Sequence, residues 1–139
     1  MAPEFKMANL FGESVTLTQH LGKEVVLLDF WASWCPPCRK GLPMVDSVAK
    51  HFAGQPVAVY GVNVQESAAQ VSSFMQTAKL DLPILMDGSG IVAEDYGVTG
   101  IPQSVVIGKD GRVHAIHVGV GRDFEESLRS EIETLLASD

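Results

Sequence analysis

Residues 25–38 read VVLLDFWASWCPPC, and the rest of the fold can be worked out from this stretch. Its first seven residues are apolar on both faces except for Asp29, which is typical of a central strand covered by helices on both sides. Helical spacing of apolar residues follows from about residue 36 to residue 52. Cys35 and Cys38 are the only two cysteines of the 139-residue chain. A CxxC pair at such a strand-to-helix turn predicts redox chemistry.

Strand and helix patterns on either side of this stretch predict the remaining elements. Apolar runs predict strands at residues 14–17, 57–64, 83–86, 103–107 and 113–118, and a turn at residues 109–111 joins the last two as a hairpin. Capping boxes at residues 67–70 and 123–126 open two helices, and a short helix covers residues 91–96. We expect the first of these helices to bury Val71, Phe74 and Ala78. The order predicts an α/β fold, with a central mixed β-sheet flanked by helices on both faces, in one domain over residues 1–139.

The CPPC dithiol is suited to disulfide exchange, which needs a thiolate. A helix N-terminus stabilises negative charge, so we expect Cys35 to be the exposed nucleophile. Cys38 lies one helical turn further on, and we expect it to be more buried and to resolve the mixed disulfide formed by Cys35. Pro36 and Pro37 have no N–H to donate to the Cys35 sulfur, and they stiffen the ring in both redox states.

A CxxC pair also occurs in zinc sites and in haem attachment motifs. A structural zinc site needs four ligands, and the chain adds only histidines, two of which, His114 and His117, are expected on opposite faces of a strand. Haem attachment needs a histidine directly after the second cysteine, where Arg39 stands. Two inert core cysteines remain an alternative. We therefore expect no metal.

Asp29 is a lone acid in the apolar strand. A buried carboxyl has a raised pKa, which suits proton transfer near neutral pH. Strand alternation places Asp29 on the same face as Leu27 and Trp31. We expect Asp29 to accept and return the proton of Cys38; the alternative is a structural acid with satisfied hydrogen bonds.

The two tryptophans and one proline flank the cysteine pair. Trp31 lies in the apolar strand and is expected in the core, whereas Trp34 is expected to be exposed and to contact substrate. Pro102 follows Ile101 before a predicted strand. Most X–Pro bonds are trans, so base rates alone predict an ordinary loop proline there.

Composition excludes several other functions. The chain has 10 Lys and Arg against 17 Asp and Glu, a formal net charge of −7. Nucleic-acid binding needs a basic stripe, and the chain has none. The acidic balance also disfavours anionic lipid, and no apolar run is long enough to span a membrane. Residues 1–10 show no apolar signal-peptide core.

These residues resemble the thioredoxin superfamily. The matching features are WCPPC at residues 34–38, Pro43, and Gly100-Ile101-Pro102 before a strand. Within the superfamily the chain is similar to the TlpA/ResA-like thiol–disulfide oxidoreductases, with an AhpC/TSA–Redoxin type domain. The features shared with that branch are residues 2–5, 14–17 and 30–39, a βα-type insertion near residues 66–86, and the turn at residues 109–111.

The resemblance implies a thioredoxin-like fold in which Pro102 is cis and faces the CxxC. The Ile101 backbone would then pair with an extended substrate segment, and Asp29 would match the buried acid of thioredoxin. Gly41 stands where ResA-like cytochrome-maturation proteins carry a glutamate, which weakens an apocytochrome c assignment. Gly61 stands where thioredoxins place a lysine beside the acid.

The sequence thus predicts a bacterial enzyme that reduces protein disulfides. Cys35, Cys38 and Asp29 would be catalytic, and substrate would be held by Trp34, Pro36, Pro37, Ile101 and Pro102. We expect protein substrates, an upstream thiol reductase, no dissociable cofactor and a monomer. The resemblance implies an extracytoplasmic location with a signal or anchor removed, and the alternative is the cytoplasm. The functional alternatives are a disulfide-forming oxidant and a non-catalytic, redox-sensing module that binds peptides.

Overall fold

The computed structural model describes residues 1–138, so residue 139 of the expected domain lies outside the described part. Its strands are β1 Lys6–Asn9, β2 Ser14–Thr16, β3 Val25–Trp31, β4 Val57–Val64, β5 Ile84–Asp87, β6 Gln103–Ile107 and β7 Val113–Val118. Its helices are α1 Pro36–His51, α2 Ala68–Ala78, α3 Ile91–Asp95 and α4 Phe124–Ala137, with a 3-10 turn η1 at Thr18–His20.

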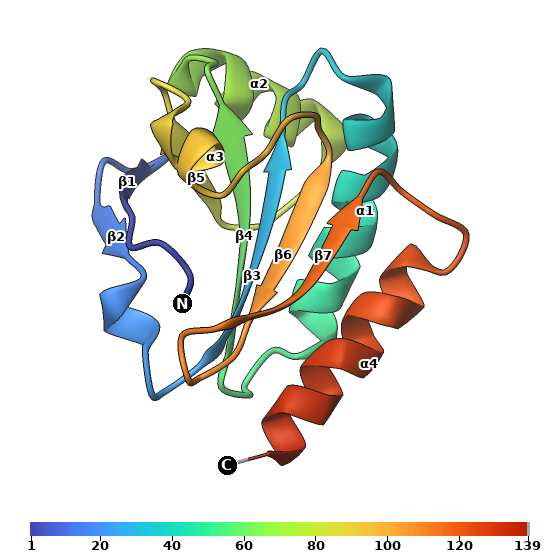
Figure 1. Ribbon diagram of the computed structural model, residues 1–139. Helices are drawn as coiled ribbons and strands as arrows, with labels where there is room; N and C mark the ends of the chain where they lie inside the picture. The colour runs from blue at the N-terminus through green and yellow to red at the C-terminus, as the bar shows by residue number, and fades with distance from the viewer. Residues whose placement is uncertain (139) are drawn as a thin grey trace.

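All seven strands form one mixed sheet with the order β2-β1-β5-β4-β3-β6-β7 (Figure 1). The central strands β3, β4 and β5 are parallel, because α1 and α2 carry the chain back across the sheet between them. β6 pairs antiparallel with β3, and β7 pairs antiparallel with β6. The predicted α/β fold with a mixed sheet is confirmed, and α2 and β5 occupy the insertion expected near residues 66–86.

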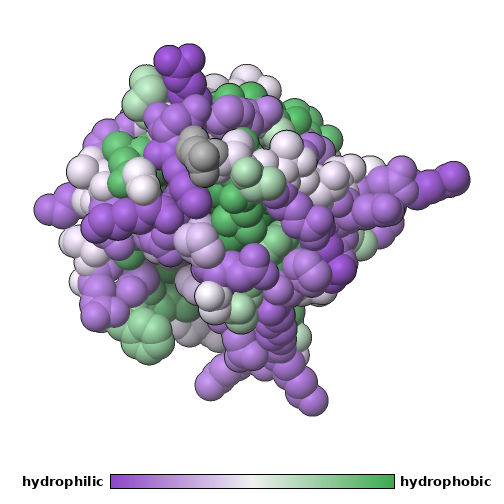
Figure 2. Space-filling model, turned by 90° about the horizontal axis from the view of Figure 1, so that it is seen from below, coloured by the Kyte–Doolittle hydropathy of each residue, from purple (hydrophilic) through white to green (hydrophobic). Residues whose placement is uncertain are grey.

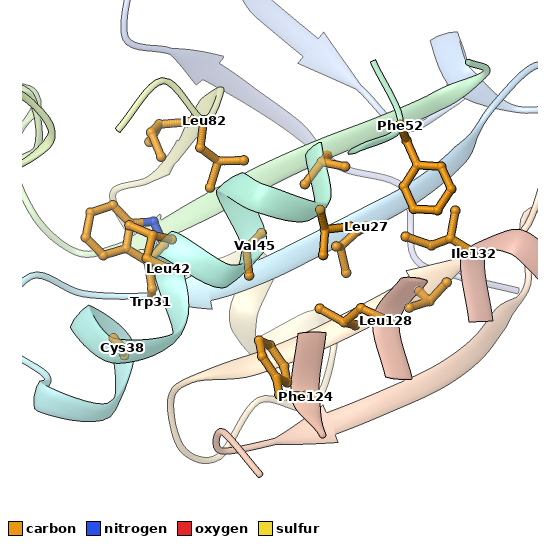
Figure 3. Close-up of a cluster of buried hydrophobic side chains, with 14 of the residues drawn as sticks. Leu27, Trp31, Cys38, Leu42, Val45, Phe52, Leu82, Phe124, Leu128 and Ile132 are labelled. Atoms are coloured by element: carbon orange, nitrogen blue, oxygen red, sulfur yellow. The ribbon is translucent and has the colours of Figure 1, made fainter. Parts of the chain in front are cut away.

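Two apolar cores lie on the two faces of the sheet. On one face α1, α2 and α4 cover β3. The close-up in Figure 3 shows Leu27 and Trp31 of β3 with side chains of α1 and α4, and Cys38 at the start of α1. On the other face α3 and the N-terminal segment cover the sheet, burying residues such as Phe5 and Phe30. β3 is buried along its whole length as a result.

The CxxC loop lies at the carboxyl end of β3, at the top of Figure 1, where β3 leads into α1. The opposite end of the molecule has a mostly hydrophilic surface with a small apolar area near its centre (Figure 2). Catalytic groups of α/β sheets gather at the carboxyl ends of the strands. The sheet therefore positions both cysteines at the end where the fold class places active sites.

Three local expectations were wrong or incomplete. β1 was not predicted, because a four-residue strand is too short to show a clear period and is held by pairing with β2 and β5. The capping box at Asp123 is absent: the residue has φ −106° and ψ 27°, outside the extended region from which a cap side chain reaches back. Ala78 is exposed, and Met75 is buried in its place.

Candidate active site

Cys35 is the N-cap residue of α1, and its backbone is extended at φ −94° and ψ 111°. Pro36 and Pro37 occupy the first two helical positions and have no N–H. The first free N–H of the helix is therefore that of Cys38, and it donates to the Cys35 Sγ at 3.3 Å. The CPPC sequence thus directs the N-terminus of a 16-residue helix at one sulfur.

The expectation of an exposed Cys35 is wrong for this structure, in which the residue is only 4% exposed. The loop before β6 covers it: the Cys35 thiol donates to the Ile101 carbonyl oxygen at 3.7 Å. The Ile101–Pro102 bond is cis, as the resemblance implied. The Pro102 carbonyl accepts a hydrogen bond from the Gly119 N–H at 2.8 Å, which ties this loop to the end of β7.

Cys38 is fully buried at the start of α1. Burial raises the pKa of its thiol to about 12, with further contributions from the Cys35 sulfur and from the nearby negative charge of Asp29. Cys38 therefore keeps its proton at neutral pH unless a base removes it. The two cysteines of the pair differ sharply in what surrounds their sulfur atoms.

Asp29 lies in the middle of β3, on the face that packs against α1, and is 2% exposed. Burial raises its pKa to about 7, and a hydrogen bond from the Ser104 hydroxyl to Oδ1, at 2.8 Å, acts in the opposite direction. Near neutral pH the carboxyl is thus close to half ionised. A group in that condition is able both to accept and to release a proton.

Gly61 lies opposite Asp29 on β4. A Cβ atom there would lie 3.0 Å from the Trp31 Nε1 and 2.9 Å from the Ile84 Cδ1. The indole of Trp31 thus fills the space that a side chain at position 61 would need. Among residues 1–138 no cation pairs with Asp29, and its one side-chain hydrogen bond comes from Ser104.

A carboxylate that sequence reasoning missed holds the loop before Cys35. Glu66 accepts hydrogen bonds from the Ser33 N–H at 2.7 Å, the Ser33 hydroxyl at 2.6 Å and the Asn63 amide at 2.8 Å. The Arg39 guanidinium donates to the Ser33 carbonyl oxygen at 3.0 Å. Partial burial raises the pKa of Glu66, but the hydrogen bonds from Asn63 and Ser33 outweigh it, so the pKa is lowered overall. No motif marks Glu66, because its partners come from β4 and from the loop after β3.

Exposed apolar groups surround the covered Cys35. Trp34 is 68% exposed, as expected, and Pro36 and Pro37 are also exposed. Ile101 is half-buried and Pro102 is buried on the other side of the sulfur. The structure therefore brings the residues predicted to hold substrate to the end of the sheet where both cysteines lie.

Within residues 1–138 no cluster of three or more His, Cys, Asp or Glu side chains could hold a metal ion. No helix in the described part of the chain combines the length and apolarity needed to cross a membrane.

Comparison with known proteins identifies the family. The AhpC/TSA family matches residues 1–116. The thioredoxin-like protein YneN of Bacillus subtilis (strain 168) is 40% identical over 132 residues, which cover 91% of this chain and 76% of the relative. The thiol-disulfide oxidoreductase ResA of Geobacillus thermodenitrificans is 32% identical over 134 residues, covering 96% and 75%.

A solved structure has the same fold as this chain. The thiol:disulfide interchange protein of the thioredoxin family from Chlorobium tepidum TLS has a TM-score of 0.82 at 26% identity, covering 98% of this chain and 95% of that chain. These likenesses favour neither zinc binding nor inert packing as the role of the cysteine pair. The chain belongs to the AhpC/TSA family and is a thioredoxin-fold thiol–disulfide oxidoreductase.

Proposed function

We propose that the chain reduces disulfide bonds in proteins. One observation carries this proposal: Cys35 caps α1, the buried Cys38 lies behind it, and Asp29, with a pKa near 7, is close enough to influence the Cys38 thiol. Disulfide exchange needs one thiolate that attacks first and a second thiol that is activated only after the first has reacted. The helix N-terminus at Cys35 suits the first role once substrate displaces the Ile101 loop, and the buried surroundings of Cys38 suit the second.

In the first step the Cys35 thiolate attacks one sulfur of the substrate disulfide. The Cys38 N–H, at 3.3 Å from Sγ, and the N-terminus of α1 stabilise that thiolate. A new bond forms between the Cys35 sulfur and the substrate, the substrate disulfide breaks, and the departing sulfur takes a proton from solvent. The product is a mixed disulfide.

In the second step the carboxylate of Asp29 takes the proton of Cys38, and the Cys38 thiolate attacks the Cys35 sulfur. The intramolecular disulfide forms, the bond from Cys35 to substrate breaks, and the second substrate sulfur leaves as a thiolate. This thiolate takes up a proton, and Asp29 gives up the proton it took from Cys38. Two electrons pass from the dithiol to the substrate, and the two protons that the cysteines lose balance the two that the substrate sulfurs gain by way of solvent and Asp29. No dissociable cofactor is required in this scheme.

Binding of substrate is proposed at the apolar surface around Cys35. An extended segment would pair with the backbone of Ile101 beside Pro102, and it would pack against Trp34, Pro36 and Pro37. This segment would displace the Ile101 carbonyl from its contact with the Cys35 thiol. The burial of Cys35 then restricts reaction to substrates that can open this loop.

We also propose the oligomeric state, the electron donor and the location of this enzyme. Residues 1–139 would form one domain that acts as a monomer, and an upstream thiol reductase would return two electrons after each cycle. The names of the relatives support work on thiols and disulfides. We place the protein outside the cytoplasm, on the resemblance to the TlpA/ResA branch.

Cysteine variants test the proposed roles. Cys38→Ser should accumulate covalent complexes between Cys35 and substrate proteins, which non-reducing gels display and mass spectrometry identifies. The matched variant Cys35→Ser should give none. Recovery of complexes through Cys38 in Cys35→Ser, or none in either variant, would contradict the assigned order of attack.

The direction of electron flow is tested by the midpoint potential of the Cys35–Cys38 pair, measured against glutathione or dithiothreitol. A reductant should lie near the value of about −270 mV known for thioredoxin. A value near about −120 mV, as in DsbA, would indicate an enzyme that forms disulfides instead.

A further inference from the structure

This inference rests on the proposed proton transfer between Cys38 and Asp29. Ser104 of β6 lies directly opposite Asp29 of β3 in the antiparallel register. Its hydroxyl donates to Asp29 Oδ1 at 2.8 Å, and both residues are buried, with exposures of 1% and 2%. No other side-chain hydrogen bond to Asp29 exists among residues 1–138. The carboxyl is therefore held at one oxygen, and the other stays available.

Within residues 1–138, no charged side chain on the surrounding elements contacts Asp29 as Ser104 does. β4 presents Gly61 at the matching position, and α1 presents the neutral thiol of Cys38. β7 places His117 next to Ser104 in register, but His117 Nε2 is paired with Glu131 of α4 at 2.8 Å. The hydroxyl of Ser104 is thus the one group within the described residues that stabilises a negative charge on Asp29 by direct contact.

We propose that Ser104 is a positioning residue for the resolving step. Its hydroxyl fixes Oδ1, stabilises the ionised carboxylate, and leaves Oδ2 to receive the proton of Cys38. A hydrogen bond to the charged form of an acid favours that form. Without the hydroxyl, Asp29 stays protonated to higher pH and fewer molecules hold the base that Cys38 needs.

Single-turnover kinetics with Ellman's reagent, dithionitrobenzoate, test this proposal. Reduced protein reacts at Cys35 and releases one thionitrobenzoate, and attack by Cys38 then releases the second. The rate of the second release, followed from pH 5 to pH 9, should rise with ionisation of Asp29. In Ser104→Ala the midpoint should move up by about one pH unit, which lowers the rate at pH 7 about fivefold.

Three further variants make the result specific. Ser104→Thr keeps the hydroxyl, so the rate of its second release should depend on pH as in the parent protein. Ser47→Ala removes a hydroxyl that donates to Glu125 at 3.1 Å, away from Asp29, and should leave the profile unchanged. Asp29→Asn should abolish the pH step, which is the rise with pH in the rate of the second release.

The outcomes distinguish failure of the role proposed for Ser104 from failure of the role proposed for Asp29. If Asp29→Asn removes the pH step but Ser104→Ala does not move it, the role of Ser104 is overturned and that of Asp29 stands. If Asp29→Asn leaves the step in place, the proton role of Asp29 fails and the role of Ser104 fails with it. Carbon-13 NMR titration of the Asp29 carboxyl gives a second readout: its midpoint must rise in Ser104→Ala, and an unchanged midpoint overturns the proposal.

Discussion

Cys35 and Cys38 are chemically identical side chains placed three residues apart, and the fold gives their sulfur atoms different surroundings. Cys35 caps α1 and receives the Cys38 N–H, whereas Cys38 lies among apolar side chains that raise its pKa to about 12. The difference follows from the helix start, since only the capping residue meets the free N–H groups. In the proposed mechanism Asp29 is the base that removes the proton of Cys38.

Hydrogen bonds to the Glu66 carboxylate hold the loop before Cys35. Glu66→Ala removes three hydrogen bonds and leaves the Ser33 N–H and the Asn63 amide without their acceptor, so the free energy of unfolding should fall by about 2–4 kcal/mol. The folded pKa of Glu66 is lowered, so its carboxylate stabilises the fold above the ordinary value of 4.5. The deficit should therefore shrink as the pH falls below that value.

Urea unfolding at pH 7 and pH 3.5 measures this deficit. Glu94→Ala is the matched control, because Glu94 is exposed and makes no side-chain hydrogen bond in the described part of the chain. Equal losses for the two variants at pH 7 would show that Glu66 does not hold the loop before Cys35.

The pairing of β3 with β4 determines how Asp29 is surrounded. Asp29 lies opposite Gly61, and the indole of Trp31 covers the glycine. Close packing between adjacent strands, rather than a counter-ion, thus fills the space beside the acid. Such a site raises the pKa of the carboxyl by burial, with little to oppose it except the hydrogen bond from Ser104.

Gly61→Ala tests this account of the strand pair. Alanine ordinarily stabilises a strand relative to glycine, but here its Cβ would lie 2.9 Å from Ile84 and 3.0 Å from Trp31. We expect a loss of about 1–3 kcal/mol in the free energy of unfolding. Gly88→Ala, where a Cβ meets nothing within 4 Å, should be neutral or slightly stabilising in the same thermal or urea measurement. A stabilised Gly61→Ala protein would show that the indole moves aside easily.

For the whole molecule, the buried acid makes stability depend on pH. Asp29 titrates near 7 in the fold, against an ordinary value of 3.8. Between these values the unfolded chain has lost a proton that the folded chain keeps. This group therefore lowers stability as the pH rises from about 4 to about 7, and the loss is complete above that window.

Asp29→Asn should remove this pH dependence. At pH 8 the variant should be more stable than the parent by roughly 2–4 kcal/mol, and at pH 4 the two should be nearly equal. Urea unfolding of the reduced proteins across this range measures the difference, with the exposed Asp95→Asn as control. A constant difference between pH 4 and pH 8 would contradict the raised pKa of Asp29.

Local sequence patterns were enough to predict most elements and the chemistry. Apolar runs, the Ser67 capping box and the CPPC stretch predicted the central strands, the helices and the redox pair, because these signals depend on residues close together in the chain. The resemblance placed the Ile101–Pro102 loop near the CxxC, but the contacts around the site became known from the folded chain alone. They are the Ile101 carbonyl on the Cys35 thiol, the Ser104 hydroxyl on Asp29, and Glu66 behind Ser33. Each of these contacts joins residues 33 to 75 positions apart. No local pattern records such a contact, because its energy depends on strand register and packing rather than on neighbours in sequence.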